Sequence, residues 1–223
     1  MNRKLFLEAL ETRTVPSVGG FLVASAILHS TESYGDFVTA EYANLLHRAP
    51  DSAGFNFFQN QMIQGAAPEV IEAEFVTSTE YLGKHGGTAT GWVTGLYQNL
   101  LGRTPNSAEV SFWTTAMARG VGAFTVALGF STSVERDADV VTTFYHNLLG
   151  RAPDAIGLTD FVTLMRSGAN RLEVESVIVG STEYIVDHGN SSTGFINGAY
   201  HDLLQRAPSN NELIFWEDEL SMI

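Results

Sequence analysis

The residues of this 223-residue sequence that are best suited to ionic chemistry recur at fixed places. One arginine stands near the end of each of four similar motifs, and one glutamate stands in each of four Ser-x-Glu sequences. A guanidinium group binds a carboxylate or a phosphate through two parallel hydrogen bonds. The set could therefore bind an anionic ligand or join the parts of a repeated fold. The residues are Arg48, Arg103, Arg151 and Arg206, with Glu32, Glu80, Glu135 and Glu183.

The equal number of arginines and glutamates favours a structural joint. In a joint, each arginine stabilises the carboxyl end of a helix and pairs with a glutamate or with backbone carbonyls. An active site is rarely present in four equivalent copies, whereas a joint between repeat units must be. We therefore expect a structural role for these eight residues.

The histidines and serines form no repeated catalytic or metal-binding pattern. The serine of each Ser-x-Glu lies on an apolar helix face, but no copy adds a histidine and an acid at constant spacing. His85 and His188 fall in two glycine-rich linkers, and a metal would need more ligands than these linkers share. The sequence contains no cysteine. We expect no enzymatic activity, no metal and no cofactor.

Three phenylalanines, Phe57, Phe112 and Phe215, lie at the edge of an apolar helix stripe, and the fourth equivalent position is Asp160. They could pack between repeat units or, if exposed, stack on sugars or a partner protein. An exposed aromatic row among Asn and Asp would favour glycan binding, and a large flat apolar patch would favour protein assembly. The two long linkers, with His85 and His188, are further candidates because loops on rigid scaffolds carry function.

A repeat in the sequence places these residues at equivalent positions. Its central motif reads YANLLHRAPD, YQNLLGRTPN, YHNLLGRAPD and YHDLLQRAPS, starting at Tyr42, Tyr97, Tyr145 and Tyr200. The motif prolines are separated by 55, 48 and 55 residues, and a large aromatic residue follows each of them by eight. The alternating separation gives a longer period of 103 residues. Such self-similarity is typical of a helical repeat protein.

The sequence pattern of each repeat unit predicts three helices, which we name C, A and B in chain order. Helix A carries apolar residues at positions i, i+4, i+7 and i+8 and ends at the proline. Helix B starts with Asp, Asn or Ser, which cap helices well. Helix C is apolar and leads into Ser-x-Glu. We predict an all-α helical repeat protein of about twelve helices, with four three-helix units arranged as two similar halves. The units cover about 19–66, 67–121, 122–169 and 170–223, and the halves cover 19–121 and 122–223.

The amino-terminal segment has two interpretations. The basic start and the apolar run Phe21–Leu28 resemble parts of a signal peptide, but acidic residues and a proline separate them. The run precedes a Ser-x-Glu, as the other C helices do, so we predict a repeat helix there. Residues 1–18 then form a leader outside the folded core.

Charge and hydropathy exclude several partners. The formal net charge of −13 argues against nucleic acid, which needs a basic face, and against anionic lipid. No apolar run approaches the roughly 20 residues that span a bilayer. We therefore expect no nucleic-acid partner and no transmembrane segment.

The repeat resembles a bacterial family known as domain of unknown function 4214. The shared pattern is Y-x-x-L-L-x-R-x-P-[DNS]-x-x-[GE]-x-x-x-[FW] with a later S-x-E, and it covers nearly all of 19–223. Copies two and four carry Glu where the family has Gly, and Arg136 replaces a tyrosine in copy two. The family looks distantly related to phycobilisome linker domains and is often found in exported proteins. The resemblance implies no catalytic activity.

A second resemblance concerns Leu7–Ser17, which reads LEALETRTVPS. It is similar to a short amino-terminal tag on predicted surface proteins of planctomycete bacteria, and it implies an extracellular or cell-envelope location. The sequence is thus expected to encode a noncatalytic exported module that binds an unidentified protein or glycan. The alternatives are a structural linker in a surface assembly and a surface hydrolase.

Overall fold

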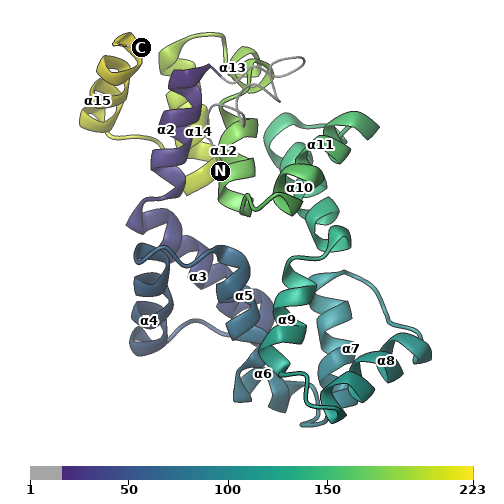
Figure 1. The fold of residues 1–223 in the computed structure, drawn as a ribbon. Helices are drawn as coiled ribbons and strands as arrows, with labels where there is room; N and C mark the ends of the chain where they lie inside the picture. The colour runs from purple at the N-terminus through teal and green to yellow at the C-terminus, as the bar shows by residue number, and fades with distance from the viewer. Residues whose placement is uncertain (1–16, 223) are drawn as a thin grey trace. The chain divides into compact units, whose positions relative to one another are not determined.

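A computed structural model describes residues 17–222 of the chain (Figure 1). The regular elements of these residues are fourteen helices, which confirms the prediction of an all-α helical repeat protein. The helices are α2 (Val18–Leu28), α3 (Thr31–Leu46), α4 (Ser52–Ile63), α5 (Pro68–Thr77), α6 (Thr79–Lys84), α7 (Ala89–Leu100), α8 (Ser107–Ala118), α9 (Ala123–Ser131), α10 (Val134–Leu149), α11 (Ala155–Arg166), α12 (Arg171–Val179), α13 (Thr182–Asp187), α14 (Ser192–Leu204) and α15 (Asn210–Ser221).

The predicted C, A and B helices are present in every unit. Helix C is α2, α5, α9 or α12, helix A is α3, α7, α10 or α14, and helix B is α4, α8, α11 or α15. The two helices beyond the expected twelve are α6 and α13, which have six residues each and lie in the long linkers. The linkers therefore differ from the short connections by an added helix and a glycine-rich turn.

The serine of each Ser-x-Glu caps the helix that follows it. Its hydroxyl accepts a hydrogen bond from the backbone N–H three residues later, at 3.1–3.2 Å in all four copies. This bond satisfies one of the N–H groups that a helix leaves unpaired at its start. We predicted only that these serines lie on the apolar face of helix C, and their capping role was not recognised. The caps are Ser30, Ser78, Ser133 and Ser181.

The cap residues after the motif prolines behave as the sequence predicts. Each accepts a hydrogen bond from the backbone N–H three residues on. Glu109 and Glu212 complete capping boxes at two of these caps. The caps are Asp51, Asn106, Asp154 and Ser209.

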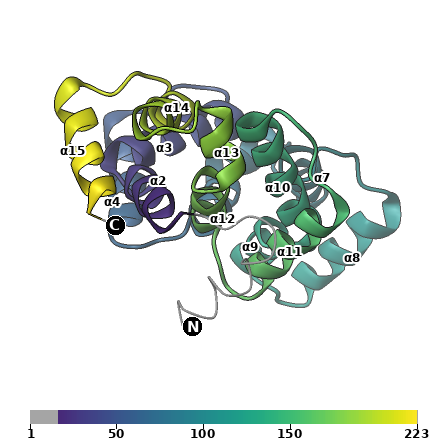
Figure 2. The same ribbon diagram turned by 90° about the horizontal axis from the view of Figure 1, so that it is seen from above.

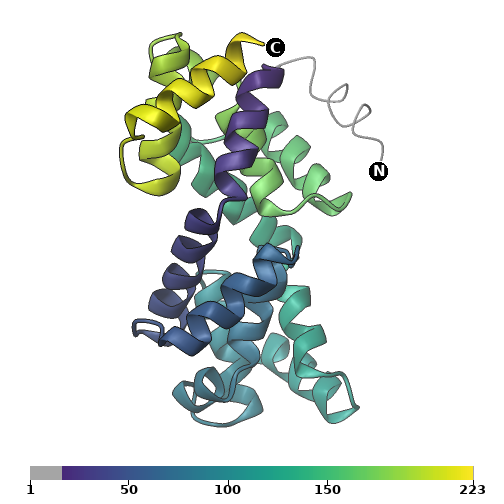
Figure 3. The same ribbon diagram turned by 90° about the vertical axis from the view of Figure 1, so that its left-hand side faces the viewer.

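The described chain divides into two compact bodies. The first, which we call the α2 body, contains residues 17–33, 141–161 and 171–222. The second, the α5 body, contains residues 34–140 and 162–170. Each body is built around one pair of C helices: α2 lies against α12, and α5 lies against α9 (Figures 1–3).

This pairing of C helices differs from the sequence halves 19–121 and 122–223. Helix α2 belongs to the first half but packs on α12, α14 and α15 of the second, and α9 of the second half packs on α5 of the first. The side chains of Val23 and Ile27 are buried in the α2 body, as are those of Ile71 and Phe75 in the α5 body. The two similar halves therefore describe the repeat in the sequence, while each compact body takes one C helix from each half.

The apolar run Phe21–Leu28 lies within α2, a repeat helix packed in the core, as the repeat indicated. The predicted leader, residues 1–18, lies outside the described residues except for Ser17, which caps α2, and Val18. Within residues 17–222, none of the helices combines the length and the apolar character needed to cross a bilayer.

Candidate functional site

Each recurring arginine binds the glutamate of the next repeat unit through two hydrogen bonds. The Nε and Nη2 atoms of the guanidinium group lie 2.5–3.0 Å from the two carboxylate oxygens in all four copies. The arginine of the fourth unit binds the glutamate of the first, so the set of pairs is cyclic. The pairs are Arg48–Glu80, Arg103–Glu135, Arg151–Glu183 and Arg206–Glu32.

The other contacts of each guanidinium group also belong to the joint. In the first, third and fourth units, Nη1 donates to the carbonyl of the following residue at 3.0–3.1 Å. In every unit the guanidinium carbon lies 4.7–4.9 Å from the centre of the motif tyrosine ring, a cation–π distance. The glutamate occupies the edge of the guanidinium group that an anionic ligand would need.

The ion pairs perturb the carboxylates. The hydrogen bond from Arg206 lowers the pKa of Glu32, and the one from Arg48 lowers the pKa of Glu80. Arg206 also binds Glu212 at 2.7 and 3.0 Å, and this contact, together with a backbone N–H of Ser209, lowers the pKa of Glu212 to about 2. These carboxylates are therefore ionised partners of the joint, not proton donors.

The joints of odd and even units differ in one coupled set of residues. In the first unit, a Cβ at Gly54 would overlap the hydroxyl of Tyr42, so the tyrosine requires glycine there. In the second unit the same position is Glu109, which binds Arg103, and the Tyr97 hydroxyl accepts a hydrogen bond from Trp113 at 3.2 Å. The third and fourth units repeat this alternation with Gly157 and Glu212. The replacement of Gly by Glu in copies two and four is therefore a second form of the joint.

The three phenylalanines of helix B are exposed to solvent. Phe57, Phe112 and Phe215 are 59%, 64% and 53% exposed. Each ring meets the next aromatic residue of its helix edge-on, with centroids 4.7–5.1 Å apart, so each exposed ring packs against a neighbour on one side. An exposed polar residue follows each ring by three positions, on the same helix face. These residues are Asn60, Thr115 and Asp218.

The two linker histidines are packing contacts. Each imidazole packs against a buried tyrosine, with ring centroids 4.0–4.3 Å apart. The other side of each ring meets a glycine of the following A helix, where a Cβ would overlap the imidazole. The histidine therefore fixes the linker against helix A. The two clusters are Tyr81–His85–Gly95 and Tyr184–His188–Gly198.

Helix α14, which follows the second linker, carries an acidic residue that sequence reasoning missed. Asp202 accepts a hydrogen bond from the Tyr184 hydroxyl at 2.7 Å, and its carboxylate lies 3.4 Å from Nε2 of His188 and 2.9 Å from Nδ1 of His201. On α7, which follows the first linker, Asn99 accepts the equivalent bond from Tyr81 at 2.8 Å. Comparison of the copies at the 103-residue period would have marked this position, because it changes from an amide to an acid.

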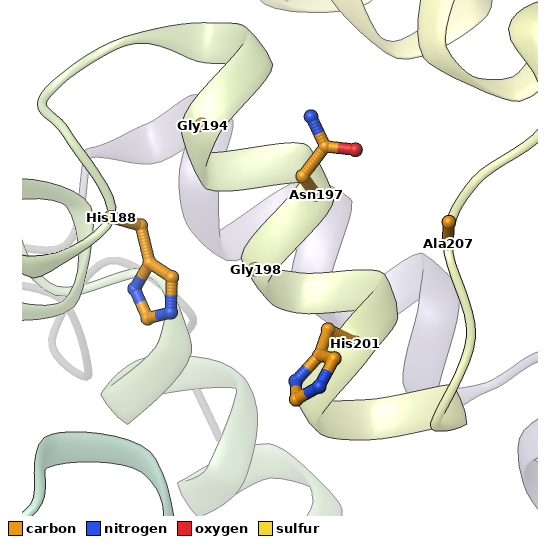
Figure 4. Close-up of a pocket in the computed structure, with 6 residues that line it drawn as sticks. All are labelled: His188, Gly194, Asn197, Gly198, His201 and Ala207. Carbon is orange, nitrogen blue, oxygen red and sulfur yellow. The ribbon is translucent and has the colours of Figure 1, made fainter.

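A hollow of about 470 Å³ opens beside this acid on the surface of α14 (Figure 4). Asn197 and His201 stand on α14, four residues apart on one helix face. The segment before α15 borders the hollow at Ala207. The lining residues are His188, Gly194, Asn197, Gly198, His201 and Ala207.

A buried charge pair also distinguishes the two bodies. In the α5 body, Arg136 lies 2.5 Å from Glu72, whose side chain is 1% exposed. The residues one period away in the α2 body are Glu175 and Ser33. Burial raises the pKa of Glu175 to about 7, and the charge of Arg171 opposes this shift only in part. The α2 body thus keeps the acid without the arginine at the equivalent position.

In the part of the chain that the structure describes, no three histidine, aspartate or glutamate side chains are grouped to hold a metal ion. The carboxylate of Asp202 instead serves as a shared hydrogen-bond acceptor for neighbouring rings.

The family described as "Domain of unknown function (DUF4214)" matches residues 22–85, 72–140 and 135–188. The matched ranges overlap and together run from 22 to 188, so the fourth motif copy, from Tyr200, lies beyond them. The chain belongs to this family. No curated protein and no solved structure matches it.

Proposed function

We propose that this member of the DUF4214 family is a noncatalytic, exported module that binds a glycan or a protein. The exposed phenylalanines of helix B carry the proposal. Burying an aromatic ring in an interface removes a large apolar area from water, and a fixed ring loses little conformational freedom on binding. Three rings with more than half of their surface exposed have no role in the core that would explain them.

The surroundings of these rings favour a glycan. Phe57 and Phe112 each have an exposed polar residue three positions on along the helix, Asn60 and Thr115. A sugar ring offers an apolar face for stacking and hydroxyl groups that pair with amide and hydroxyl side chains. Isolated rings among polar groups suit such a ligand better than a broad protein interface, which needs a contiguous apolar core.

Binding of the full chain to a glycan array tests the proposal. The triple variant Phe57→Ala, Phe112→Ala, Phe215→Ala is expected to bind at least tenfold more weakly than the wild type, as expected for losing several stacking contacts. Ile63→Ala and Val134→Ala, which remove other exposed apolar side chains, serve as matched controls and should bind normally. Unchanged binding by the triple variant would contradict the proposal.

The fourth repeat position offers a gain-of-function arm. Asp160 is exposed and occupies the place of the three phenylalanines in the third unit. Asp160→Phe restores the missing ring and should tighten glycan binding. If it weakens binding while the fold is intact, the equivalence of the four positions fails.

The proposed export rests on the amino-terminal resemblance to the planctomycete surface tag, together with the resemblance of the repeats to a family found in exported proteins. Cell fractionation with mass spectrometry of the mature amino terminus tests it. We expect the protein in the extracellular or envelope fraction. Recovery of an intact Met1 form in the cytosol alone would overturn this part of the proposal.

A structural linker is the second candidate, suggested by the resemblance to phycobilisome linkers and favoured by one surface. Ile214 and Phe215 are adjacent exposed residues of α15, and the exposed Met222 follows directly after the end of the helix. This stripe is more continuous than the aromatic positions of α4 and α8. If the chain assembles proteins, Ile214→Ser should abolish capture of a partner while Phe57→Ala leaves it intact.

A further inference from the structure

The hollow over α14 is a second place where the chain could hold a small ligand. None of the helix B phenylalanines lines it, and ligand binding there does not depend on them. Its volume, about 470 Å³, lies within the range of roughly 300–1,000 Å³ typical of small-molecule sites. Its lining residues decide which class of ligand it could bind.

Two polar side chains face the hollow with unused hydrogen-bonding capacity. The amide nitrogen of Asn197 donates to the carbonyl of Thr193 at 2.8 Å, and its amide oxygen has no partner among the described residues. His201 places Nδ1 against Asp202 and is 77% exposed, so Nε2 is open to a ligand. An amide offers donor and acceptor together, and an imidazole adds another hydrogen-bonding atom nearby.

The acid behind the hollow fixes the imidazole. Asp202 is 19% exposed and is held by the Tyr184 hydroxyl, so its carboxylate cannot turn freely. Because the same carboxylate contacts Nδ1 of His201, the ring is oriented before a ligand arrives. Orientation in advance lowers the entropy lost on binding.

The fold does not require these residues. The first linker closes in the same way, with Asn99 in place of Asp202, Gln98 in place of His201 and Thr94 in place of Asn197. Tyr81 is as completely buried against its amide as Tyr184 is against its acid. The same packing is therefore reached with either set of residues.

Charge restricts the ligand. The lining of the hollow contains neither lysine nor arginine, and the chain carries a net charge of −13. An anionic ligand would meet the Asp202 carboxylate without a fixed cation to offset it. The available groups suit an uncharged molecule with neighbouring hydroxyl groups.

We propose that the hollow over α14 binds a neutral sugar ring through Asn197 and His201 (Figure 4). Adjacent hydroxyls of the sugar bond to the Asn197 amide and to Nε2 of His201. Gly194 and Gly198 of α14 also line the hollow. Asp202 is a positioning residue, which acts on the ligand by holding the imidazole.

Saturation-transfer NMR with the full chain tests this site, with glucose, galactose, mannose and N-acetylglucosamine as probes and glucuronic acid as the charged comparison. At least one neutral sugar should bind, and Asn197→Ala with His201→Ala should weaken its binding at least tenfold. The matched control is Thr94→Ala with Gln98→Ala, the same positions on α7, which should leave binding unchanged. The triple phenylalanine variant should also retain it, which separates this site from the aromatic surface.

The variant Asp202→Asn reproduces the first linker and tests the positioning role. It should unfold at the wild-type temperature yet bind the sugar a few-fold more weakly. The site is refuted if none of the neutral sugars binds, if glucuronic acid binds more tightly than they do, or if the α7 control weakens binding as much as the α14 variant.

Discussion

Arg206 binds Glu32, which precedes it by 174 residues, through two hydrogen bonds of 2.6 and 2.7 Å. The other three joints connect residues 32 positions apart, each from one repeat unit to the next. The last unit thus uses the glutamate of the first as if it were a fifth unit. The contact accompanies the packing of α2 on α12, and both bring the start of the described chain into the α2 body.

The first prediction concerns this closing joint. Arg206→Ala removes the guanidinium group and leaves Glu32 and Glu212 near each other without a cation. Since the side chains are about one-third exposed, solvent screens much of the attraction, and we expect a loss of about 1 kcal/mol in the free energy of unfolding. Urea denaturation measures it. Arg206→Lys should recover only part of the loss, because lysine cannot form the two parallel bonds.

A double-mutant cycle between Arg206 and Glu32 separates their interaction from other effects of each substitution. A coupling energy near zero would show that the closing joint does not hold the first turn of α3 in place.

The parts of the fold that the sequence predicted depend on local rules. The Pro that ends helix A and the cap that starts helix B act within a few residues, so the pattern at Pro50 and Asp51 was sufficient. The pairing of α2 with α12 was not predictable in the same way. Four similar C helices can pair in several combinations. Which pairs form depends on how their apolar faces are buried in the folded chain, and the sequence pattern does not show this. The sequence halves were therefore recognised, but the exchange of C helices between them was not.

The second prediction concerns stability at acid pH. The hydrogen bond from Arg206 and capping at Ser209 lower the pKa of Glu212 to about 2, below its ordinary value of 4.5. A lowered carboxylate pKa contributes stability that is complete above pH about 4.5 and is lost as the pH falls toward 2. Glu212→Gln keeps a side chain that can cap but removes the charge. We expect the variant to be about 1 kcal/mol less stable at pH 7 and nearly equal to the wild type near pH 2.

Chemical denaturation at several pH values tests the effect of Glu212. Glu219→Gln is the control on the same helix, since Glu219 forms no ion pair with a described residue. If both variants show the same dependence of stability on pH, the effect of Glu212 does not come from its ion pair with Arg206.

The third prediction concerns Glu175, whose effect on the pH dependence of stability is opposite to that of Glu212. Burial raises the pKa of Glu175 to about 7, so the folded chain keeps a proton that the unfolded chain releases above about 4.5. The contribution of this acid to stability is complete below pH 4.5 and is lost as the pH rises through 7. Glu175→Gln stays neutral and should gain about 2 kcal/mol over the wild type at pH 8 but little at pH 4. Thermal unfolding at the two pH values measures this difference.

Ser33→Arg tests the role of Glu175 by supplying the arginine that the α2 body lacks at this position. Arg136 shows that an arginine at this repeat position reaches the acid on helix C, because it pairs with Glu72 in the α5 body. The introduced arginine should lower the pKa of Glu175 and remove the loss of stability between pH 5 and 8. A profile that still declines would mean that the two bodies are not equivalent here.

The candidate site illustrates what repeat analysis can and cannot find. The joint residues were visible because they recur, and Phe57 was visible because it is aromatic at a recurring place. Asp202 was overlooked because it interrupts the recurrence at one copy, and its hydrogen bond with Tyr184 exists only after the linker folds back on α14. Residues that break a repeat therefore need the same attention as those that define it.

The last prediction concerns Gly54, which lies in the first turn of α4 beside the Tyr42 hydroxyl. In an exposed helix, alanine is about 1 kcal/mol more favourable than glycine. Here the added Cβ would overlap the hydroxyl, so Gly54→Ala should destabilise the chain, and Gly54→Ala combined with Tyr42→Phe should recover part of the loss by removing that oxygen. Gly129→Ala in α9 is the control, because a Cβ there meets nothing within 4 Å, and it should stabilise the chain. If both glycine variants stabilise the protein in urea denaturation, the Tyr42 hydroxyl does not require glycine at the joint.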